Sequence, residues 1–255
     1  MENISLVLVD LDGTLFRDDK SISEYSKQTI KRLQQKGVLF GICTSRAYVN
    51  SIKFLDGISP DIFITNGGGM VRQGEKKIYT CQFSVEEVRT LIEATFKICG
   101  PDAILSADNE EGLYSNSKEE LGDKFWTFND FLDFQEPAMK VCIQTLDKDK
   151  VSKIAQSIGS DRIDFLPFSD IPWYKMTLKD ATKEKAISVM SQKLNIPLEQ
   201  IAAFGDDFSD IGMLKLCGKG IAMQNAIPQV KKIASGICRS NEEDGIAHWL
   251  EENLL

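Results

Sequence analysis

The sequence predicts an α/β protein with a doubly wound, mostly parallel sheet and an α+β domain inserted in its middle. Three observations predict it. Short apolar runs alternate with helical stretches at both ends of the chain. The middle of the chain contains several strand-like stretches and two helical ones in another order. The excess negative charge lies only in this middle segment. The 255 residues, 42% of them hydrophobic and 27% charged, are enough for one large core or two small ones.

Five short apolar runs at the two ends have the length of buried strands. They are residues 4–9, 38–42, 62–65, 201–204 and 219–222. Helical stretches alternate with them, near residues 24–36, 46–55, 183–194 and 207–217. Strands and helices that alternate in this way are joined by right-handed crossovers, which build a parallel sheet with helices on both faces.

The middle of the chain has another order of elements. SVEEVRTLIEATFKIC (84–99) and DKDKVSKIAQSI (147–158) predict helices. The stretches that predict strands are DAILSAD, GLYSN, KVCIQTL, IDFLPF and WYKMTL. Two helices over an antiparallel sheet is the economical arrangement. FWTFNDFLDF (125–134) places Phe128, Phe131 and Phe134 three residues apart, which predicts a helix with a core-facing aromatic stripe.

Charge separates the same middle segment from the rest. Residues 82–180 contain 11 Lys and Arg against 19 Asp and Glu, whereas the remainder contains 19 of each. We therefore predict a core domain of residues 1–81 and 181–255 and an inserted domain of residues 82–180. The net charge of −8 argues against nucleic acid and anionic membranes as partners.

Several classes of protein are excluded at this stage. No run of about 18 apolar residues indicates a membrane span, and the start, MENISLVLVD, lacks the features of a signal peptide. The six cysteines (43, 81, 99, 142, 217 and 238) have no paired spacing, which favours reduced thiols in the cytoplasm. His248 is the single histidine and lies in a helical segment, where a solvated or capping role is expected.

LVLVDLDGTLFRDD (6–19) places Asp10 and Asp12 directly after an apolar strand, where unpaired acids are costly. An EF-hand calcium loop counted from Asp10 fails, because glycine falls at position 4 and position 12 is Ser21. An Asx turn explains one aspartate but not two. At the carboxyl end of a strand, however, both can face the crevice in which doubly wound sheets bind ligands.

Three further stretches add to this site. FGICTSRAY places Thr44 and Ser45 between a strand and a helix, where they can bind phosphate or form a plain N-cap. Lys183 stands at another predicted helix start, where a surface lysine is the ordinary alternative. AAFGDDFSDIGML places Asp206, Asp207 and Asp210 after a buried strand. Such oxygen ligands, without histidine or cysteine, point to Mg²⁺.

In this order, DLDGT, TSR, Lys183 and GDDFSD resemble the four motifs of the haloacid dehalogenase (HAD) superfamily, in particular its Cof-type phosphatases. TNGGG (65–69), MQNAIPQVKKIA (223–234) and SNEEDGIAHWLEE (240–252) are similar to the family's auxiliary stretches. The resemblance implies a Rossmann-like core with an α+β cap in the position of the insert. It also implies a Mg²⁺-dependent phosphatase of small phosphate monoesters. We further expect a cytoplasmic protein that is a monomer or a weak homo-oligomer.

The resemblance assigns roles by position. Asp10 would be the nucleophile that takes the phosphoryl group, and Asp12 the general acid and then the base. The carboxylates of Asp10 and Asp206 and the backbone carbonyl of Asp12 would hold Mg²⁺, with Asp210 as ligand or outer support. The phosphate or substrate would be bound by Thr44, Ser45, Lys183 and Ser209, with Asn66 and Asn225 lining the site or ordering its loops.

Two positions depart from the family pattern. Ser209 replaces the usual asparagine and has a shorter arm toward the phosphate, and Glu184 replaces a glycine after Lys183, which adds an acid near the mouth of the pocket. Two other classes are alternatives. A phosphotransferase or mutase of the superfamily would use the same aspartyl-phosphate but pass the phosphoryl group to a sugar. A phospho-receiver module also has a doubly wound fold with an acidic cluster, but it would need only about half this length and would lack an inserted cap and the acid at Asp12.

Overall fold

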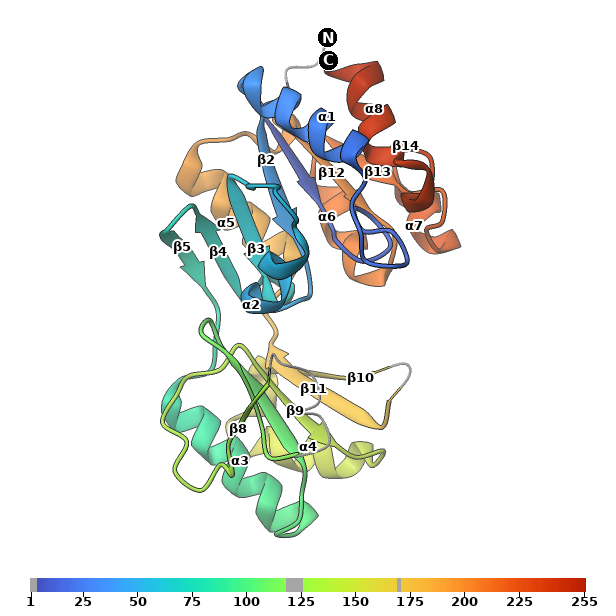
Figure 1. The fold of residues 1–255 in the computed structure, drawn as a ribbon. Coiled ribbons are helices and arrows are strands. Elements are labelled where there is room, and N and C mark those ends of the chain that lie inside the picture. Colours follow the sequence, from blue (N-terminus) through green and yellow to red (C-terminus); the bar gives the residue numbers. More distant parts are fainter. Residues whose placement is uncertain (1–3, 118–125, 169–170) are drawn as a thin grey trace. The chain divides into compact units, whose positions relative to one another are not determined.

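The computed structural model describes residues 4–117, 126–168 and 171–255, and it contains two compact units. One unit, here called the core unit, comprises the described residues of Met1–Arg46, Ser51–Thr80 and Thr182–Leu255. The other, the insert unit, comprises Ala47–Asn50 and the described residues of Cys81–Ala181. Each unit is built around its own sheet (Figure 1).

The sheet of the core unit has eight strands among the described residues. In chain order they are β1 (Leu6–Val9), β2 (Leu39–Cys43), β3 (Ile62–Thr65), β4 (Met70–Gln73), β5 (Lys76–Thr80), β12 (Ile201–Gly205), β13 (Lys219–Ala222) and β14 (Gly236–Ile237). Their order across the sheet is β14-β13-β12-β1-β2-β3-β4-β5. All pairs from β14 to β3 are parallel, and only β4 and β5 are antiparallel. The predicted doubly wound, mostly parallel sheet is therefore confirmed.

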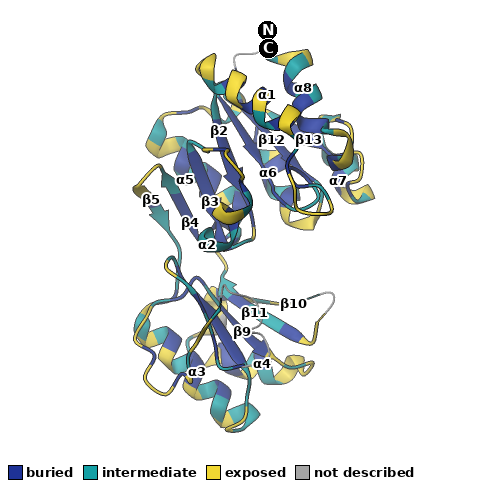
Figure 2. Ribbon diagram, in the orientation of Figure 1, coloured by how far each residue is buried: buried dark blue, intermediate teal, exposed yellow. Residues whose placement is uncertain are grey.

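Helices cover both faces of this sheet. They are α1 (Glu24–Gln35), α5 (Lys183–Leu194), α6 (Ile211–Leu216), α7 (Pro228–Ile233) and α8 (Gly245–Asn253). Figure 1 shows α1 and α8 on one face and α5 and α6 on the other. Every residue of β1 is fully buried as a result, and in Figure 2 the central strands of the sheet are dark blue while the outer helix faces carry yellow. No helix among the described residues is both long and apolar enough to cross a bilayer.

The helix expected over residues 46–55 is much shorter in the structure. It consists of the four-residue helix α2 (Tyr48–Ser51) followed by one 3-10 turn, Ile52–Phe54. The segment YVNSIKF explains the difference, because Tyr, Val, Asn, Ser, Ile and Phe all have weak helix propensity. Lys53 alone among the seven is a good helix former.

The insert unit is α+β, as expected. Its strands are β6 (Leu105–Asp108), β7 (Leu113–Ser115), β8 (Trp126–Phe128), β9 (Lys140–Gln144), β10 (Ile163–Pro167) and β11 (Trp173–Leu178), in the order β10-β11-β9-β6-β7-β8. All neighbouring pairs are antiparallel except β7 and β8. Helices α3 (Val85–Cys99) and α4 (Lys148–Gln156) share one buried core with the sheet, to which Leu91, Ile154 and Val141 contribute.

The prediction of a helix over residues 125–134 is wrong. Residue 125 lies outside the described residues, Trp126–Phe128 is strand β8, and Phe128 is 46% exposed. Phe131 and Phe134 are buried, but on irregular backbone, with φ of Phe131 at 60°. The cause is local hydrogen bonding, since the Asn129 side chain accepts from the N–H of Phe131 at 2.8 Å and the Asp130 side chain from that of Leu132 at 3.1 Å.

Candidate active site

The predicted site residues meet at the carboxyl edge of the core sheet. Strands β12, β1 and β2 are neighbours, and their parallel register aligns Val9 with Phe204 and with Ile42. The residues that follow each strand therefore lie side by side, Asp10 after β1, Thr44 after β2 and Asp206 after β12. Asp10 is also fixed through its backbone N–H, which donates to the carbonyl of Phe204 at 3.1 Å.

Three carboxylates come together at this edge. Asp10, Asp206 and Asp210 each present a ligand oxygen, and these oxygens lie within 4.8 Å of one another. The ammonium of Lys183 donates to Asp10 Oδ1 at 2.7 Å and to Asp210 Oδ1 at 2.6 Å. Lys183 is 2% exposed and Asp210 is fully buried, so Lys183 is no surface lysine. We call these three acids the carboxylate cluster.

The three acids differ in how many of their carboxylate oxygens accept hydrogen bonds from the protein. Asp210 uses both, because its Oδ2 accepts from the N–H groups of Asp206 and Asp207 at 2.9 and 3.0 Å. Asp206 accepts at Oδ1 from the hydroxyl of Thr14 at 2.7 Å. Asp210 therefore orders the loop after β12 and anchors Lys183, while Asp10 and Asp206 are better placed to bind a ligand.

The electrostatics of the cluster favour an added cation. Burial raises the pKa of Asp10 to about 7 against the pull of Lys183, and Asp210 pushes it further upward. Burial likewise raises the pKa of Asp206 to about 6, although Thr14 donates to it. Burial alone would lower the pKa of Lys183, but Asp10 and Asp210 hold it well above its usual range. When all three carboxylates are ionised, the single positive charge of Lys183 leaves two negative charges uncompensated.

The side chain of Asp12 does not belong to the carboxylate cluster. Its carboxylate forms a two-point ion pair with Arg46, Nε to Oδ2 at 2.6 Å and Nη2 to Oδ1 at 2.7 Å, and Lys20 Nζ adds a third contact at 2.8 Å. Burial would raise the pKa of Asp12, but the hydrogen bonds from Arg46 and Lys20 outweigh it and leave the pKa below its ordinary value. The guanidinium of Arg46 also stacks over the rings of Phe16 and Phe54.

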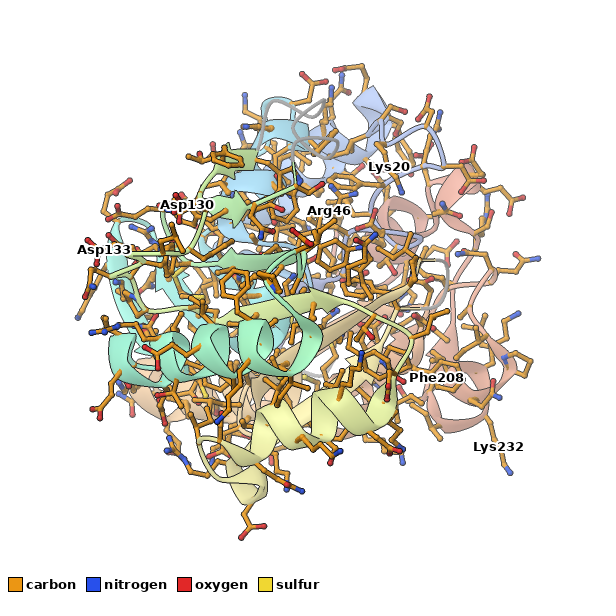
Figure 3. The ribbon with its side chains drawn as sticks, turned by 90° about the horizontal axis from the view of Figure 1, so that it is seen from below. Lys20, Arg46, Asp130, Asp133, Phe208 and Lys232 are labelled. Carbon is orange, nitrogen blue, oxygen red and sulfur yellow. The ribbon has the colours of Figure 1, made fainter. Side chains whose placement is uncertain are left out.

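Arg46 and Lys20, both labelled in Figure 3, are site residues that the sequence analysis missed. Arg46 is the third residue of the TSR motif, and its position next to Thr44 and Ser45 could have indicated that it belongs to the site. Lys20 follows Asp12 by eight residues in a polar loop, and φ of 67° turns its backbone into the left-handed region. Nothing in the sequence distinguishes it from a solvated surface lysine.

Thr44 and Ser45 differ in their surroundings. Thr44 is buried, its N–H donates to the carbonyl of Ile64 at 2.8 Å, and its hydroxyl accepts from the N–H of Arg46 at 3.2 Å. Ser45 is exposed. Helix α2 begins only at Tyr48, so the two hydroxyls belong to the strand–helix loop and not to a helix N-cap.

The TNGGG loop connects this region to Lys183. Asn66 is 4% exposed, and neither atom of its side-chain amide has a hydrogen-bond partner among the described residues. Its backbone N–H donates to the carbonyl of Arg46 at 2.8 Å. Gly68, with φ of 103°, lies very close to the start of α5. A β-carbon at this position would collide with the carbonyl of Thr182 and would lie 2.9 Å from the backbone nitrogen of Lys183. The loop therefore fixes the position of Lys183.

The remaining predicted residues lie around the cluster. Ser209 is exposed in the 3-10 turn Phe208–Asp210, and the exposed Phe208 is labelled in Figure 3. Glu184 packs on Gly212 at the start of α6, where its negative charge interacts favourably with the positive end of the helix dipole. Asn225 donates to the carbonyl of Gly13 at 2.7 Å. His248 contacts Tyr25 from α8. The six cysteines all lie within the described residues, and no disulfide bond joins any two of them.

A comparison with protein families identifies the chain. A profile of haloacid dehalogenase-like hydrolases matches residues 7–250. The chain belongs to this family. The resemblance seen in the four motifs is confirmed, and so is the expectation of a hydrolase.

Curated relatives match over almost their whole length. The 5-amino-6-(5-phospho-D-ribitylamino)uracil phosphatase YitU of Bacillus subtilis (strain 168) is 29% identical, and the match covers 97% of this chain and 96% of the relative. Phosphatase YwpJ of the same organism is 24% identical over 98% of this chain and 100% of the relative.

Solved structures show the same fold. A haloacid dehalogenase-like hydrolase from Bacteroides thetaiotaomicron superposes with a TM-score of 0.85 at 24% identity, covering 98% of this chain and 99% of that one. The protein TM0651 from Thermotoga maritima also has a TM-score of 0.85, at 21% identity, covering 99% and 98%. The predicted fold class is thereby confirmed a second time.

Proposed function

We propose that the protein is a Mg²⁺-dependent phosphatase that hydrolyses phosphate monoesters of small metabolites through an aspartyl-phosphate on Asp10. The observation that carries the proposal is the carboxylate cluster with the buried Lys183 at the carboxyl edge of the sheet. The curated relatives named above as phosphatases support it. We also propose that residues 82–180 form the cap that selects the leaving group.

The carboxylate cluster suits Mg²⁺ in its chemistry and charge. Its donors are carboxylate oxygens, the ligands that Mg²⁺ prefers. With all three acids ionised and Lys183 charged, the cluster carries two negative charges, which one divalent cation balances. Asp10, Asp206 and the backbone carbonyl of Asp12 would hold the ion, and Asp210 would keep the loop and Lys183 in place. Bound Mg²⁺ would neutralise charge on the phosphate and on Asp10.

Charge also explains why Asp10 needs cations beside it in order to react. A phosphate dianion about 4 Å from its carboxylate is repelled by roughly 4 kcal/mol per unit charge at an effective dielectric constant of about 20. Lys183 at 2.7 Å offsets part of that repulsion. Attack by Asp10 on phosphorus then forms the aspartyl-phosphate and releases the leaving group, and water hydrolyses the intermediate to inorganic phosphate. Thr44, Ser45, Ser209 and Asn66 are the proposed contacts for the phosphate or substrate.

Asp12 is proposed to protonate the leaving-group oxygen and then to take a proton from the attacking water. In the structure Arg46 and Lys20 hold it as a carboxylate, the form it needs as the base of the second step. To act as the acid of the first step it must bind a proton, so its ion pairs with Arg46 and Lys20 must weaken when substrate is bound. The phosphate dianion is a competing partner for both cations.

A phosphate-release screen over about a hundred phosphorylated metabolites tests the proposed activity. We expect release with Mg²⁺, none after chelation with EDTA, and one inorganic phosphate per substrate consumed. A phosphotransferase or mutase would instead consume substrate without matching phosphate release. Wild-type protein that releases no phosphate from any compound would contradict the proposal.

The acidic insert favours a leaving group that is neutral or cationic, such as a sugar, a polyol or pyridoxal, over a second polyanion. Its net charge of −8 would repel further phosphates. The ribityl group in the name of the relative YitU supports this preference. We therefore expect kcat/KM to be higher for sugar monophosphates than for bisphosphates and nucleotides at equal ionic strength. A higher kcat/KM for every bisphosphate and nucleotide than for the sugar monophosphates would contradict this hypothesis.

Lys183→Met should lower kcat/KM at least about tenfold. It removes a charge-assisted contact worth roughly 1.5–3 kcal/mol, and each factor of ten corresponds to about 1.4 kcal/mol. Lys185→Met is the matched control, because Lys185 is an exposed lysine two residues further along α5. Steady-state kinetics at saturating Mg²⁺ measures the effect. Equal activity of the two variants would show that Lys183 does not act on the phosphate.

A further inference from the structure

The loop that carries both catalytic aspartates is held from outside by two segments more than 200 residues away in the chain. We call residues 10–21 the β1 loop, and Asn225 together with residues 240–244 the C-terminal clamp. All of these residues belong to the core unit. The clamp includes part of the SNEEDG stretch, to which the proposed chemistry gives no role.

Asn225 connects the clamp to Gly13, the residue that follows Asp12. Its side-chain Nδ2 donates to the carbonyl of Gly13 at 2.7 Å, and its Oδ1 accepts from the backbone N–H of Asn241 at 3.1 Å. Both ends of this amide are therefore occupied by the protein, although Asn225 itself is an exposed residue. An exposed amide with two fixed partners orients the loop and is not a free substrate ligand.

Asn241 and its neighbours hold the next residues of the β1 loop. The buried side chain of Asn241 donates to the carbonyl of Phe16 at 3.0 Å and to Asp18 Oδ1 at 3.2 Å. Glu242 accepts from the N–H of Asp18 at 2.7 Å. Asp244 pairs with Arg17 at 3.0 Å. The clamp thus holds Gly13 and the three residues from Phe16 to Asp18.

The position of this loop matters because it borders the carboxylate cluster. Gly13 has φ of 73°, and a β-carbon there would collide with the carboxylate of Asp206. Thr14, the next residue, donates to that same carboxylate at 2.7 Å. The peptide between Asp12 and Gly13 contains the carbonyl proposed as the third Mg²⁺ ligand, so a rotation of this peptide would move a ligand oxygen.

We propose that Asn225 and Asn241 are positioning residues for the metal: they fix the Gly13–Thr14 peptide and the residues that follow it, and through Gly13 they hold the neighbouring carbonyl of Asp12, thereby setting the affinity of the cluster for a divalent cation. The inference rests on the proposed function, because it needs a metal at the cluster. Groups that orient metal ligands without touching the metal typically contribute about 10-fold to 100-fold to affinity or activity. Loss of either side chain should therefore weaken metal binding.

Mn²⁺ alone, added to the full-length protein without substrate and followed by electron paramagnetic resonance, tests the inference. We expect Asn225→Ala and Asn241→Ala to raise the dissociation constant of Mn²⁺ at least about tenfold. Hydrogen–deuterium exchange of the metal-free variants should be faster in the β1 loop. Asn253→Ala is the matched control, since this amide donates to the carbonyl of Trp249 within α8 and should leave the dissociation constant unchanged.

The outcomes separate the clamp from the proposed function. Wild-type protein that binds no Mn²⁺ would overturn both. Binding by the wild type, with the dissociation constant of Asn225→Ala within twofold of it, would overturn the clamp and leave the phosphatase proposal intact. A lower melting temperature with unchanged Mn²⁺ affinity would likewise mean a purely structural role. If Asn241→Ala does not fold by circular dichroism, the exposed Asn225→Ala decides the question.

Discussion

Asp10→Asn should abolish turnover, because an amide cannot serve as the nucleophile. Removing the nucleophile of an enzyme that works through a covalent intermediate costs on the order of 10⁶ in kcat. Binding should survive, since the substitution also removes a negative charge that repels the phosphate dianion. Steady-state kinetics with a phosphate monoester, together with the inhibition constant for inorganic phosphate as a measure of binding, separates the two effects.

The control for Asp10→Asn is Asp207→Asn. Asp207 is an exposed acid next to Asp206, and its side chain accepts a backbone hydrogen bond that asparagine can also accept. This variant loses a negative charge near the same cluster and should keep most of its activity. Equal losses in both variants would mean that Asp10 acts only through its charge. Wild-type kcat in Asp10→Asn would remove it from the chemistry altogether.

Asp12→Asn should slow phosphoryl transfer from a sugar phosphate by about 10²–10⁴. A sugar alkoxide leaves poorly without a proton, and the loss corresponds to roughly 3–5 kcal/mol of barrier. With p-nitrophenyl phosphate the first step should be affected much less, because nitrophenolate leaves readily without a proton. The ratio of the two substrates' single-turnover rates measures the effect. A variant that slows both substrates equally would point to lost ion pairs with Arg46 and Lys20 instead of a lost acid.

The core sheet could be predicted because its signals are local. Each of the five expected strands is a run of apolar residues, and β1 is buried along its whole length. The antiparallel strands β4 and β5 were not predicted, because their sequences, MVRQ and KKIYT, mix polar with apolar residues and lack the apolar run of a buried strand. The spacing of the phenylalanines favours a helix over residues 129–134, but the side chains of Asn129 and Asp130 accept hydrogen bonds from backbone N–H groups two residues further on and hold the segment in an irregular conformation instead.

The carboxylate cluster was predictable for a different reason. Asp10 and Asp206 follow buried strands, and the carboxyl ends of parallel strands meet at one edge, so the topology brings together acids almost 200 residues apart. The partners of Asp12 were not predictable in this way. Lys20 contacts Asp12 from a turn with positive φ, and Arg46 contacts it from a loop. Such contacts depend on loop conformations that no local sequence pattern specifies.

The central claim is that Asp10 carries the phosphoryl group during hydrolysis, and trapping that species tests it most directly. In Asp12→Asn the second step lacks its base, so p-nitrophenyl phosphate should give a burst of nitrophenol and leave phosphate on the enzyme. Rapid quenching in acid, followed by mass spectrometry of the peptide that contains residues 6–19, should show one added phosphoryl group on Asp10. A variant that turns over at the wild-type rate, with no phosphorylated peptide at any quench time, would contradict the account.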